Sequence, residues 1–410
     1  MRVFPETPFR IGAYHPNVTV AALLSAYALT FPPIQGPVEP NYAATWERVK
    51  NNISTRYFAR QQRKDEMEKL FGKYGPIASK AKSKEEFSSA VNGMIRDFGD
   101  SHFDFLTTED QGFYTFGSFI RQDLPDLPHI GAWFKKSGDG YTVQMVLQGT
   151  PAAEHDIRKG DLVTLIDGKP FLPVSPLRSK IGEKVKLTLK RQGQTLEKEV
   201  EVRAAKGMNL FLEATRNSVK IIDHGGKKIG YIHLWTMAND DFRNALSNAV
   251  YGRLKDTDGF ILDIRDGFGG RPEGFGDPFF RPEANLEWKM SPSAGFTQLF
   301  GYGRPLVVIT NEGSRSAKEV FAYLIKKSGR GTLVGTTTAG HVLGTSPVPV
   351  DDWGMLEIPM VDVIADGIRI EGKGIAPDVE VKPEFDSSGK DMHLAKALEV
   401  VTAKIGAGFR

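Results

Sequence analysis

The sequence contains no cysteine, which excludes disulfide bonds, thiolate nucleophiles and metal sites built from cysteine. It also has no apolar run of 18 residues, about the length that a membrane-spanning helix requires, so we expect no stable membrane span. The formal net charge is only +3, from 53 basic and 50 acidic residues, and there is no basic block. This balance argues against nucleic acid as a partner. We expect no metal and no other cofactor.

The chain does have length and apolar content. Its 410 residues, 40% of them hydrophobic, are enough for two or three domains with cores of their own. Residues 18–28 form a short apolar stretch that follows Arg2 and Arg10 and ends in Ala26-Tyr27-Ala28, the outline of a secretory signal. A helix packed on the body of the protein is the alternative. A signal predicts a periplasmic or otherwise extracytoplasmic protein, whereas a packed helix leaves a cytoplasmic location open.

Changes in composition and periodicity divide the chain into five segments. They are a possible signal segment and Pro-rich linker (1–41), a helical domain that carries Asp100-Ser101-His102 (42–126), a small β-domain (127–205), an α/β core (206–390) and a C-terminal helix or tail (391–410).

The α/β core is organised around residues 305–340. Leu306–Ile309 is typical of a buried strand, and apolar residues recur at helical spacing from Ser316 until Gly329. Ser316 therefore lies where a strand leads into a helix, a place where a nucleophile is exposed and helix N–H groups face developing negative charge. The alternative is that Ser314 or Ser316 only caps the helix.

The small β-domain carries a series of motifs in a characteristic order. Gly149-Thr150-Pro151-Ala152-Ala153, Ile157 and the run from Gly160 to Gly168 together resemble a PDZ domain. PDZ domains bind an extended chain end by strand addition and take its carboxylate with main-chain N–H groups. The resemblance implies that Ile130, Gly131, Ala132 and Trp133 form the peptide-binding loop. An ordinary β-domain without a groove is the alternative.

Three more motifs follow in the core, at residues 263–270 (DIRDGFGG), 313–340 (GSRSAKE to VGTTTAG) and 370–381 (IEGKGIAPDVEV). Together with the PDZ-like segment they resemble the tail-specific, or carboxyl-terminal processing, serine peptidases over residues 42–383. The resemblance implies an α/β fold with a ClpP/crotonase-like peptidase domain, an inserted PDZ-like β-domain and an N-terminal helical domain.

The family has two catalytic styles, and the motifs distinguish them. A serine–lysine pair needs a lysine where this chain has His341, and a glutamine where it has Thr345. The tricorn-core style has a histidine in an N-terminal Asp-Ser-His and a glutamate before Gly-x-x-Pro-Asp, and His102 and Glu371 occupy these places. The sequence is therefore closer to the tricorn-like branch, which implies Ser316 as nucleophile, His102 as base and Glu371 as its orienting carboxylate.

These residue types suit acyl transfer. A serine hydroxyl needs a base at neutral pH, and a carboxylate fixes the tautomer of that base. We therefore expect activity to fall as the pH drops through the histidine range. The tetrahedral oxyanion needs N–H donors, for which Ala317 and either Gly269 or Gly270 are the candidates.

Two assignments have alternatives. His341 stands in the place of the lysine and is the competing base, and Glu371 can instead pair with Arg369 or Lys373. Asp263 and Arg265 are interpreted as fixing a strand end.

Three functions follow from this reading. The first is a serine endopeptidase that recognises extended or C-terminal polypeptide segments through the PDZ-like domain and acts through an acyl-enzyme. The second is a weak or inactive relative that binds peptides or other ligands. The third, an acyl-CoA enzyme of the crotonase type, is disfavoured by the PDZ-like segment and by Asp-Ser-His. Polypeptides are the expected partners, and self-association stays open.

Overall fold

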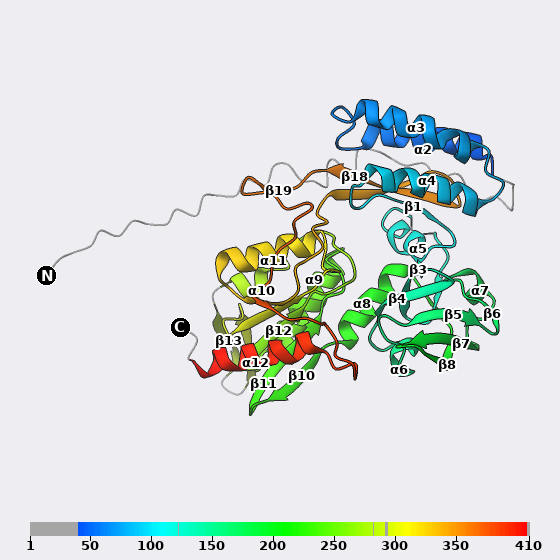
Figure 1. The fold of residues 1–410 in the computed structure, drawn as a ribbon. Helices are drawn as coiled ribbons and strands as arrows, with labels where there is room; N and C mark the ends of the chain where they lie inside the picture. Colours follow the sequence, from blue (N-terminus) through cyan, green and yellow to red (C-terminus); the bar gives the residue numbers. More distant parts are fainter. Residues whose placement is uncertain (1–39, 122, 282, 292–293, 408–410) are drawn as a thin grey trace. The chain divides into compact units, whose positions relative to one another are not determined.

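The computed structural model describes residues 40–121, 123–281, 283–291 and 294–407, so the possible signal segment lies outside the described residues. Among the described helices none is long and apolar enough to cross a membrane. The helices are α2 (Tyr42–Arg56), α3 (Lys64–Ser79), α4 (Lys84–Phe98), α5 (Gln111–Gly117), α6 (Pro151–Glu154), α7 (Ser175–Arg178), α8 (Gly207–Asn217), α9 (Asp240–Asn248), the π-helix η1 (Ala249–Arg253), α10 (Asp277–Phe280), α11 (Ala317–Ser328) and α12 (Met392–Gly406) (Figure 1).

The strands of the described residues fall into six sheets. They are β1 (Asp104–Thr107), β2 (Leu127–His129), β3 (Ala132–Ser137), β4 (Gly140–Val146), β5 (Leu162–Ile166), β6 (Lys169–Pro170), β7 (Lys184–Arg191), β8 (Gln194–Glu201), β9 (Arg203–Ala205), β10 (Lys220–His224), β11 (Lys227–His233), β12 (Gly259–Asp263), β13 (Ala284–Ser291), β14 (Ala294–Phe300), β15 (Leu306–Thr310), β16 (Thr332–Gly335), β17 (Gly344–Pro349), β18 (Gly354–Val361), β19 (Ile364–Ala365), β20 (Ile368–Arg369) and β21 (Val379–Glu380).

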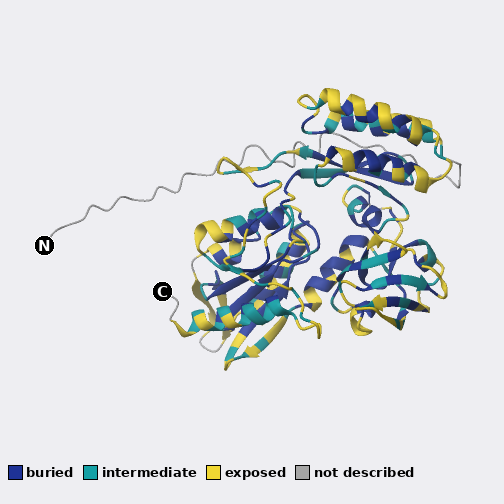
Figure 2. Ribbon diagram, viewed as in Figure 1, coloured by how far each residue is buried: buried dark blue, intermediate teal, exposed yellow. Residues whose placement is uncertain are grey.

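The central feature is a six-stranded sheet in the order β10-β11-β12-β15-β16-β21. Only β10 is antiparallel to its neighbour; the other pairs are parallel. Every residue of β12 and β15 is buried (Figure 2). Strands covered on both faces have this continuous apolar character rather than an alternating one.

Helices cover both faces of this sheet. Val307 and Ile309 share a core with Ala397 and Val401 of α12. The side chains between them in β15 point to the other face, where Val308 belongs to a core built from α8, α9 and α11. Because β12 and β15 run parallel, their carboxyl ends lie at one edge, and the loops that follow them meet there.

The N-terminal helices do not form a separate core. Helices α2 to α4 pack around a cluster that also contains Trp353, Leu356 and Ile358 from the β18 region. Strand β1 pairs with β18, which pairs with β17. The ranges 42–126 and 206–390, predicted as domains from the sequence, thus share one sheet and one core.

The β-domain between them has its own core and the sheet order β3-β4-β5-β7-β8, with β6 beside β5. Its hairpins turn at Asp167-Gly168 and Gln192-Gly193, all with positive φ, as is typical of two-residue hairpin turns. The entering strand β2 pairs with the leaving strand β9, Leu127 opposite Ala205, so the insertion begins and ends at one place.

A buried charge cluster closes β12. The Arg265 guanidinium donates to Asp263 at 2.6 Å and to Asp391, the N-cap of α12, at 2.7 Å. Burial opposes the charged form of Asp263, but the Arg265 guanidinium outweighs this effect and holds the pKa of Asp263 well below the usual range. The cluster ties the strand end to α12, in agreement with the structural role interpreted from the sequence.

Candidate active site

Ser316 occupies the N-cap position of α11 with φ 60° and ψ −127°. This backbone conformation is uncommon for a residue other than glycine and is maintained only where the surroundings enforce it. Here the Ser316 N–H donates to the His341 carbonyl at 2.7 Å, and the Ser316 carbonyl accepts from the Glu319 N–H at 2.8 Å. Ser314 is fully buried, and its hydroxyl donates to the Ile264 carbonyl at 2.9 Å, so Ser314 has a structural role.

The glycine loop after β12 lies against Ser316. A Cβ added at Gly269 would lie 2.3 Å from the Ser316 Cβ and 2.5 Å from its Oγ, so only glycine permits this approach. The Gly269 carbonyl accepts from the Met237 N–H at 2.8 Å. Because a trans peptide directs its carbonyl and the next N–H to opposite sides, the Gly270 N–H points away from Met237.

Ala317, the other predicted oxyanion donor, also lies beside Ser316. The added Cβ at Gly269 would lie 3.0 Å from the Ala317 nitrogen. Ala317 begins α11, where N–H groups have no intrahelical acceptor. Gly269 and Ala317, two of the residues predicted for the oxyanion hole, are thus brought together beside the Ser316 hydroxyl, with Gly270 next in the chain.

His102 also has positive φ, 54°, and lies two residues before β1. Its Nδ1 is 3.0 Å from the Ser101 hydroxyl. Burial, together with the charge of Arg315 and the neighbouring His341, lowers the pKa of His102 to about 3. The imidazole is therefore neutral at neutral pH, the form that a general base requires.

His341 is a neighbour of His102, with ring centroids 6.4 Å apart. Partial burial lowers its pKa, the Glu371 carboxylate opposes this shift, and Arg315 adds to it. The His341 N–H donates to Glu319 Oε2 at 2.8 Å, and its carbonyl holds the Ser316 N–H. The structure therefore brings both candidate bases to one site and fastens His341 to the serine turn through the main chain.

Glu371 has main-chain partners. Its Oε2 accepts from the Val342 N–H at 2.6 Å and from the Leu343 N–H at 3.3 Å. The alternative partner Arg369 is paired with Asp362 at 2.8 Å. Glu371 thus supports the segment that carries His341. The hydrogen-bond partner of His102 Nδ1 is not Glu371 but the Ser101 hydroxyl. In this conformation the three predicted catalytic side chains are not linked in series.

Glu319 is a site residue that sequence reasoning missed. It is fully buried, and its carboxylate accepts from the Thr338 hydroxyl at 2.6 Å and the Gly340 N–H at 2.7 Å, besides His341. Burial raises its pKa, although these hydrogen bonds oppose the shift. The sequence carried the signal: Ser316 followed by glutamate three residues later is the pattern of a capping box.

Two cations near Ser316 were also missed. Arg315 lies 5.2 Å from the centre of the Phe268 ring, and its Nε is 3.3 Å from the Gly267 carbonyl. Lys318 is completely buried. Its position three residues before Phe321 and seven before Ile325 places it in the apolar stripe of α11, which is the signal that could have revealed its burial.

The predicted peptide-binding loop is closed by the chain itself. Gln111 of α5 donates to the Ala132 carbonyl at 2.9 Å and accepts from the Phe134 N–H at 3.0 Å. These are the groups on the open edge of β3 that an added strand would use. Trp133, between them, packs 5.2 Å from Phe268 of the glycine loop. A peptide that adds to β3 must therefore displace Gln111.

One lysine joins the β-domain to the glycine loop. Lys159 Nζ lies 2.9 Å from both carboxylate oxygens of Asp266 and 2.9 Å from Glu384 Oε2. Against the effect of burial, these carboxylates raise the pKa of Lys159. The side-chain amide of Asn311, four residues before Arg315, also donates to the Asp266 carboxylate.

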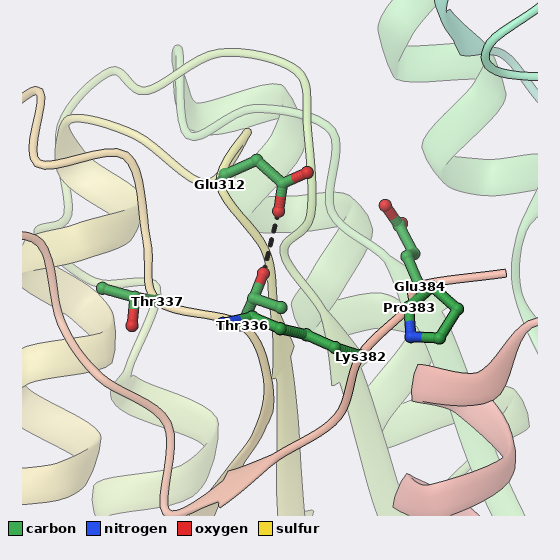
Figure 3. A pocket seen from close by; sticks show the side chains of 6 residues that line it. All are labelled: Glu312, Thr336, Thr337, Lys382, Pro383 and Glu384. Atoms are coloured by element: carbon green, nitrogen blue, oxygen red, sulfur yellow. Dashed lines mark hydrogen bonds between the residues drawn. The ribbon is translucent and has the colours of Figure 1, made fainter.

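A cavity of about 700 Å³ lies beside this bridge, with Glu384 in its lining (Figure 3). It is lined by Glu312, Thr336, Thr337, Lys382, Pro383 and Glu384. The Thr336 hydroxyl donates to Glu312 across it at 2.9 Å. No residue predicted from the sequence to act in catalysis lines this cavity.

By fold and site the chain is an α/β protein with a serine-centred site and an inserted β-domain. Residues 228–381 match the description "Peptidase family S41", and residues 128–202 match "PDZ domain". These two parts of the chain are therefore similar to the peptidase family S41 and to PDZ domains, respectively. The fold class predicted from the sequence is confirmed.

Curated relatives and solved structures are similar to the chain as well. A "Probable CtpA-like serine protease" of Staphylococcus aureus (strain N315) is 26% identical over 321 residues, which cover 73% of this chain and 61% of that protein. Its counterpart in Staphylococcus haemolyticus (strain JCSC1435) is 25% identical over 320 residues with the same coverage of both. The chain thus spans about 61% of the length of these relatives.

Among solved structures, the tricorn protease has a TM-score of 0.56 at 21% identity, covering 89% of this chain and 37% of that one. The photosystem II D1 C-terminal processing protease has a TM-score of 0.52 at 19% identity, covering 89% of this chain and 98% of that one. At these identities the likeness concerns the fold.

Proposed function

We propose that this chain is a serine endopeptidase that cleaves polypeptides through an acyl-enzyme, with Ser316 as nucleophile. The observation that carries the proposal is the strained turn at Ser316, whose hydroxyl lies against the glycine loop and whose backbone is tied to the segment of a neighbouring histidine. A turn of this kind exposes a hydroxyl beside helix N–H groups, where attack on a carbonyl produces negative charge.

The proposed chemistry assigns one task to each group. Neutral His102 takes the proton of the Ser316 hydroxyl as this oxygen attacks the substrate carbonyl carbon. The resulting oxyanion is stabilised by the N–H groups of Ala317 and Gly270. The imidazolium then returns the proton to the leaving amine, and water hydrolyses the acyl-enzyme with the same histidine as base.

The serine–histidine style is favoured over the serine–lysine style by what surrounds Ser316. The segment where the lysine would lie carries His341, and the His102 pKa is lowered enough to keep the ring neutral. Ser101 contacts His102 Nδ1 and supports its orientation. We assign Glu371 the task of shaping the site through residues 342 and 343.

The proposal is tested with a fluorophosphonate probe and a fluorogenic peptide. We expect the folded chain to be labelled on one serine, identified as Ser316 by mass spectrometry, and to hydrolyse the peptide with a burst of the first product. A chain that is neither labelled nor active on a panel of unfolded polypeptides would contradict the peptidase and favour a binding role.

We further propose that the PDZ domain recruits substrates by their free C-termini, at the edge of β3 that Gln111 now occupies. Gln111→Ala should strengthen binding of such peptides about tenfold, or about 1.4 kcal/mol, because the peptide no longer competes with two internal hydrogen bonds. Binding is measured by fluorescence anisotropy with the full chain carrying Ser316→Ala, which prevents turnover.

The control is Gln194→Ala, which changes an exposed glutamine of the β-domain itself. Peptides with amidated C-termini report on carboxylate capture. Equal affinity of Gln111→Ala and the parent chain for free C-termini would refute displacement of Gln111, and equal affinity for free and amidated peptides would refute carboxylate recognition.

A further inference from the structure

Lys318 is a buried cation that the proposed chemistry does not use. It follows Ser316 by two residues in the first turn of α11, and none of its side chain is exposed. Its Nζ donates to the Trp235 carbonyl at 2.8 Å and to the Asp266 carbonyl at 2.7 Å. Within the described residues its hydrogen-bond partners are thus two main-chain carbonyls rather than a carboxylate.

This placement is unfavourable for folding. A cation in the first turn of a helix opposes the helix dipole. Burial lowers the pKa of Lys318 from 10.5 to about 7, although the charges of Asp266 and Asp263 oppose the shift. A methionine would fill a similar volume without these costs. Stability therefore does not account for a lysine at this position.

The two carbonyls that Lys318 holds lie at the base of the glycine loop: Asp266 is in the loop itself, and Trp235 is in the segment after β11. The Trp235 carbonyl also accepts from the Phe268 N–H at 2.9 Å. Gly267, between Asp266 and Phe268, has φ 66°, and a Cβ there would lie 2.0 Å from the Trp235 oxygen and 3.2 Å from Nζ. The ammonium thus joins the start of α11 to the start of the loop, in a space that only glycine leaves open.

Few residues separate the Lys318 contact at Asp266 from Gly270, the residue proposed to bind the oxyanion. The Asp266 carbonyl points to Lys318, so the Gly267 N–H points to the other side of that peptide. Further along, Gly269 contacts Ser316 and Gly270 offers its N–H. Three of the five residues from 266 to 270 are glycines, which have more backbone freedom than other residues, so the contacts that tether this loop determine its geometry.

We propose that Lys318 is a positioning residue that holds residues 266–270 in the geometry that binds the oxyanion. The inference rests on the proposed peptidase function. In its protonated form Lys318 clamps the Asp266 carbonyl to the Trp235 carbonyl, so the glycine loop leaves its base in one fixed direction. This fixed geometry matters most in the transition state, when the carbonyl oxygen of the substrate becomes charged and needs the Gly270 N–H.

The first test compares Lys318→Met with Lys327→Met, which removes an exposed lysine from the same helix. We expect Lys318→Met to lower kcat about 10²-fold, the size of effect that a lost oxyanion donor has, with KM changed less than about threefold. Its melting temperature should change little, because removal of a costly buried charge offsets the loss of two hydrogen bonds to main-chain carbonyls. A lysine with only a structural role would instead lose stability and leave kcat unchanged.

The absence of cysteine permits a chemical rescue. In Lys318→Cys the new thiol is the only one in the chain. In the unfolded protein its thiolate displaces bromide from 2-bromoethylamine and forms a C–S bond, which gives a side chain of lysine length with an ammonium group. After refolding, kcat should recover at least tenfold over unmodified Lys318→Cys. Wild-type protein taken through the same steps is the control.

Hydrogen exchange separates this inference from the proposed function. We expect amides in residues 264–271 to exchange at least tenfold faster in Lys318→Met than in wild type and Lys327→Met. If wild type cleaves no peptide, the peptidase proposal fails while faster exchange still supports the tether. Unchanged exchange in Lys318→Met would overturn the inference, and so would unchanged kcat in an active enzyme.

Discussion

Ser316→Ala is expected to remove peptide hydrolysis, with kcat lowered about 10⁶-fold, while the protein stays folded. The hydroxyl is the atom that attacks in the proposed mechanism, and in a serine–histidine site its loss removes the whole covalent route. The turn itself should survive, because alanine has the same Cβ at φ 60° and keeps both main-chain hydrogen bonds of residue 316.

Two other serine variants serve as controls for Ser316→Ala. Ser328→Ala, at the exposed end of the same helix, should leave activity and stability unchanged. Ser314→Ala should lower the free energy of unfolding by about 1–3 kcal/mol, because it leaves the buried Asn311 N–H without its hydroxyl acceptor. The measurements are single-turnover kinetics and thermal unfolding. Turnover by purified Ser316→Ala at more than about a hundredth of the wild-type rate would exclude Ser316 as the nucleophile.

The sequence was most informative where structure is decided locally. The apolar run at 306–309, the turn chemistry after it and the helical spacing ending at Gly329 predicted β15, the serine turn and α11 with nearly the observed bounds. Ser316 differs from an ordinary N-cap serine because its φ is positive. The glycine loop was also predictable from local sequence, since only glycine tolerates contact with Ser316.

Contacts between distant segments were beyond such patterns. Nothing in residues 104–107 indicates that this strand pairs with residues 354–357, which places His102 beside His341. The occupation of the β3 edge by Gln111 depends on a helix that enters from outside the β-domain. For Glu371 the motif indicated a residue of the site, but the partner of its carboxylate is decided by the main chain of residues 342 and 343.

Burial also changed one expectation about pH. The sequence predicted an acid limb in the ordinary histidine range, near pH 6.5. A base must be neutral to accept a proton, and burial lowers the pKa of His102 to about 3. The base therefore stays competent as the pH falls through 6.5, and we expect kcat/KM to remain level down to about pH 5 in the wild type.

The choice between the two histidines is the second large effect. His102→Ala should lower kcat/KM by about 10³–10⁴-fold, as loss of a general base does in serine hydrolases. His341→Ala should cost about tenfold or less, because its ties to Ser316 and Glu319 run through the main chain, which alanine retains. Both variants should keep their circular dichroism spectra and thermal transitions.

The pH profile of each variant distinguishes removal of a base from loss of geometry. Residual activity of His102→Ala should rise with pH, since hydroxide replaces the missing base, and added imidazole should restore part of it. His341→Ala should keep the level wild-type profile between pH 5 and 7. An inactive His341→Ala beside a nearly normal His102→Ala would assign the base to His341. Glu371 would then be the carboxylate that raises its pKa from the adjoining segment.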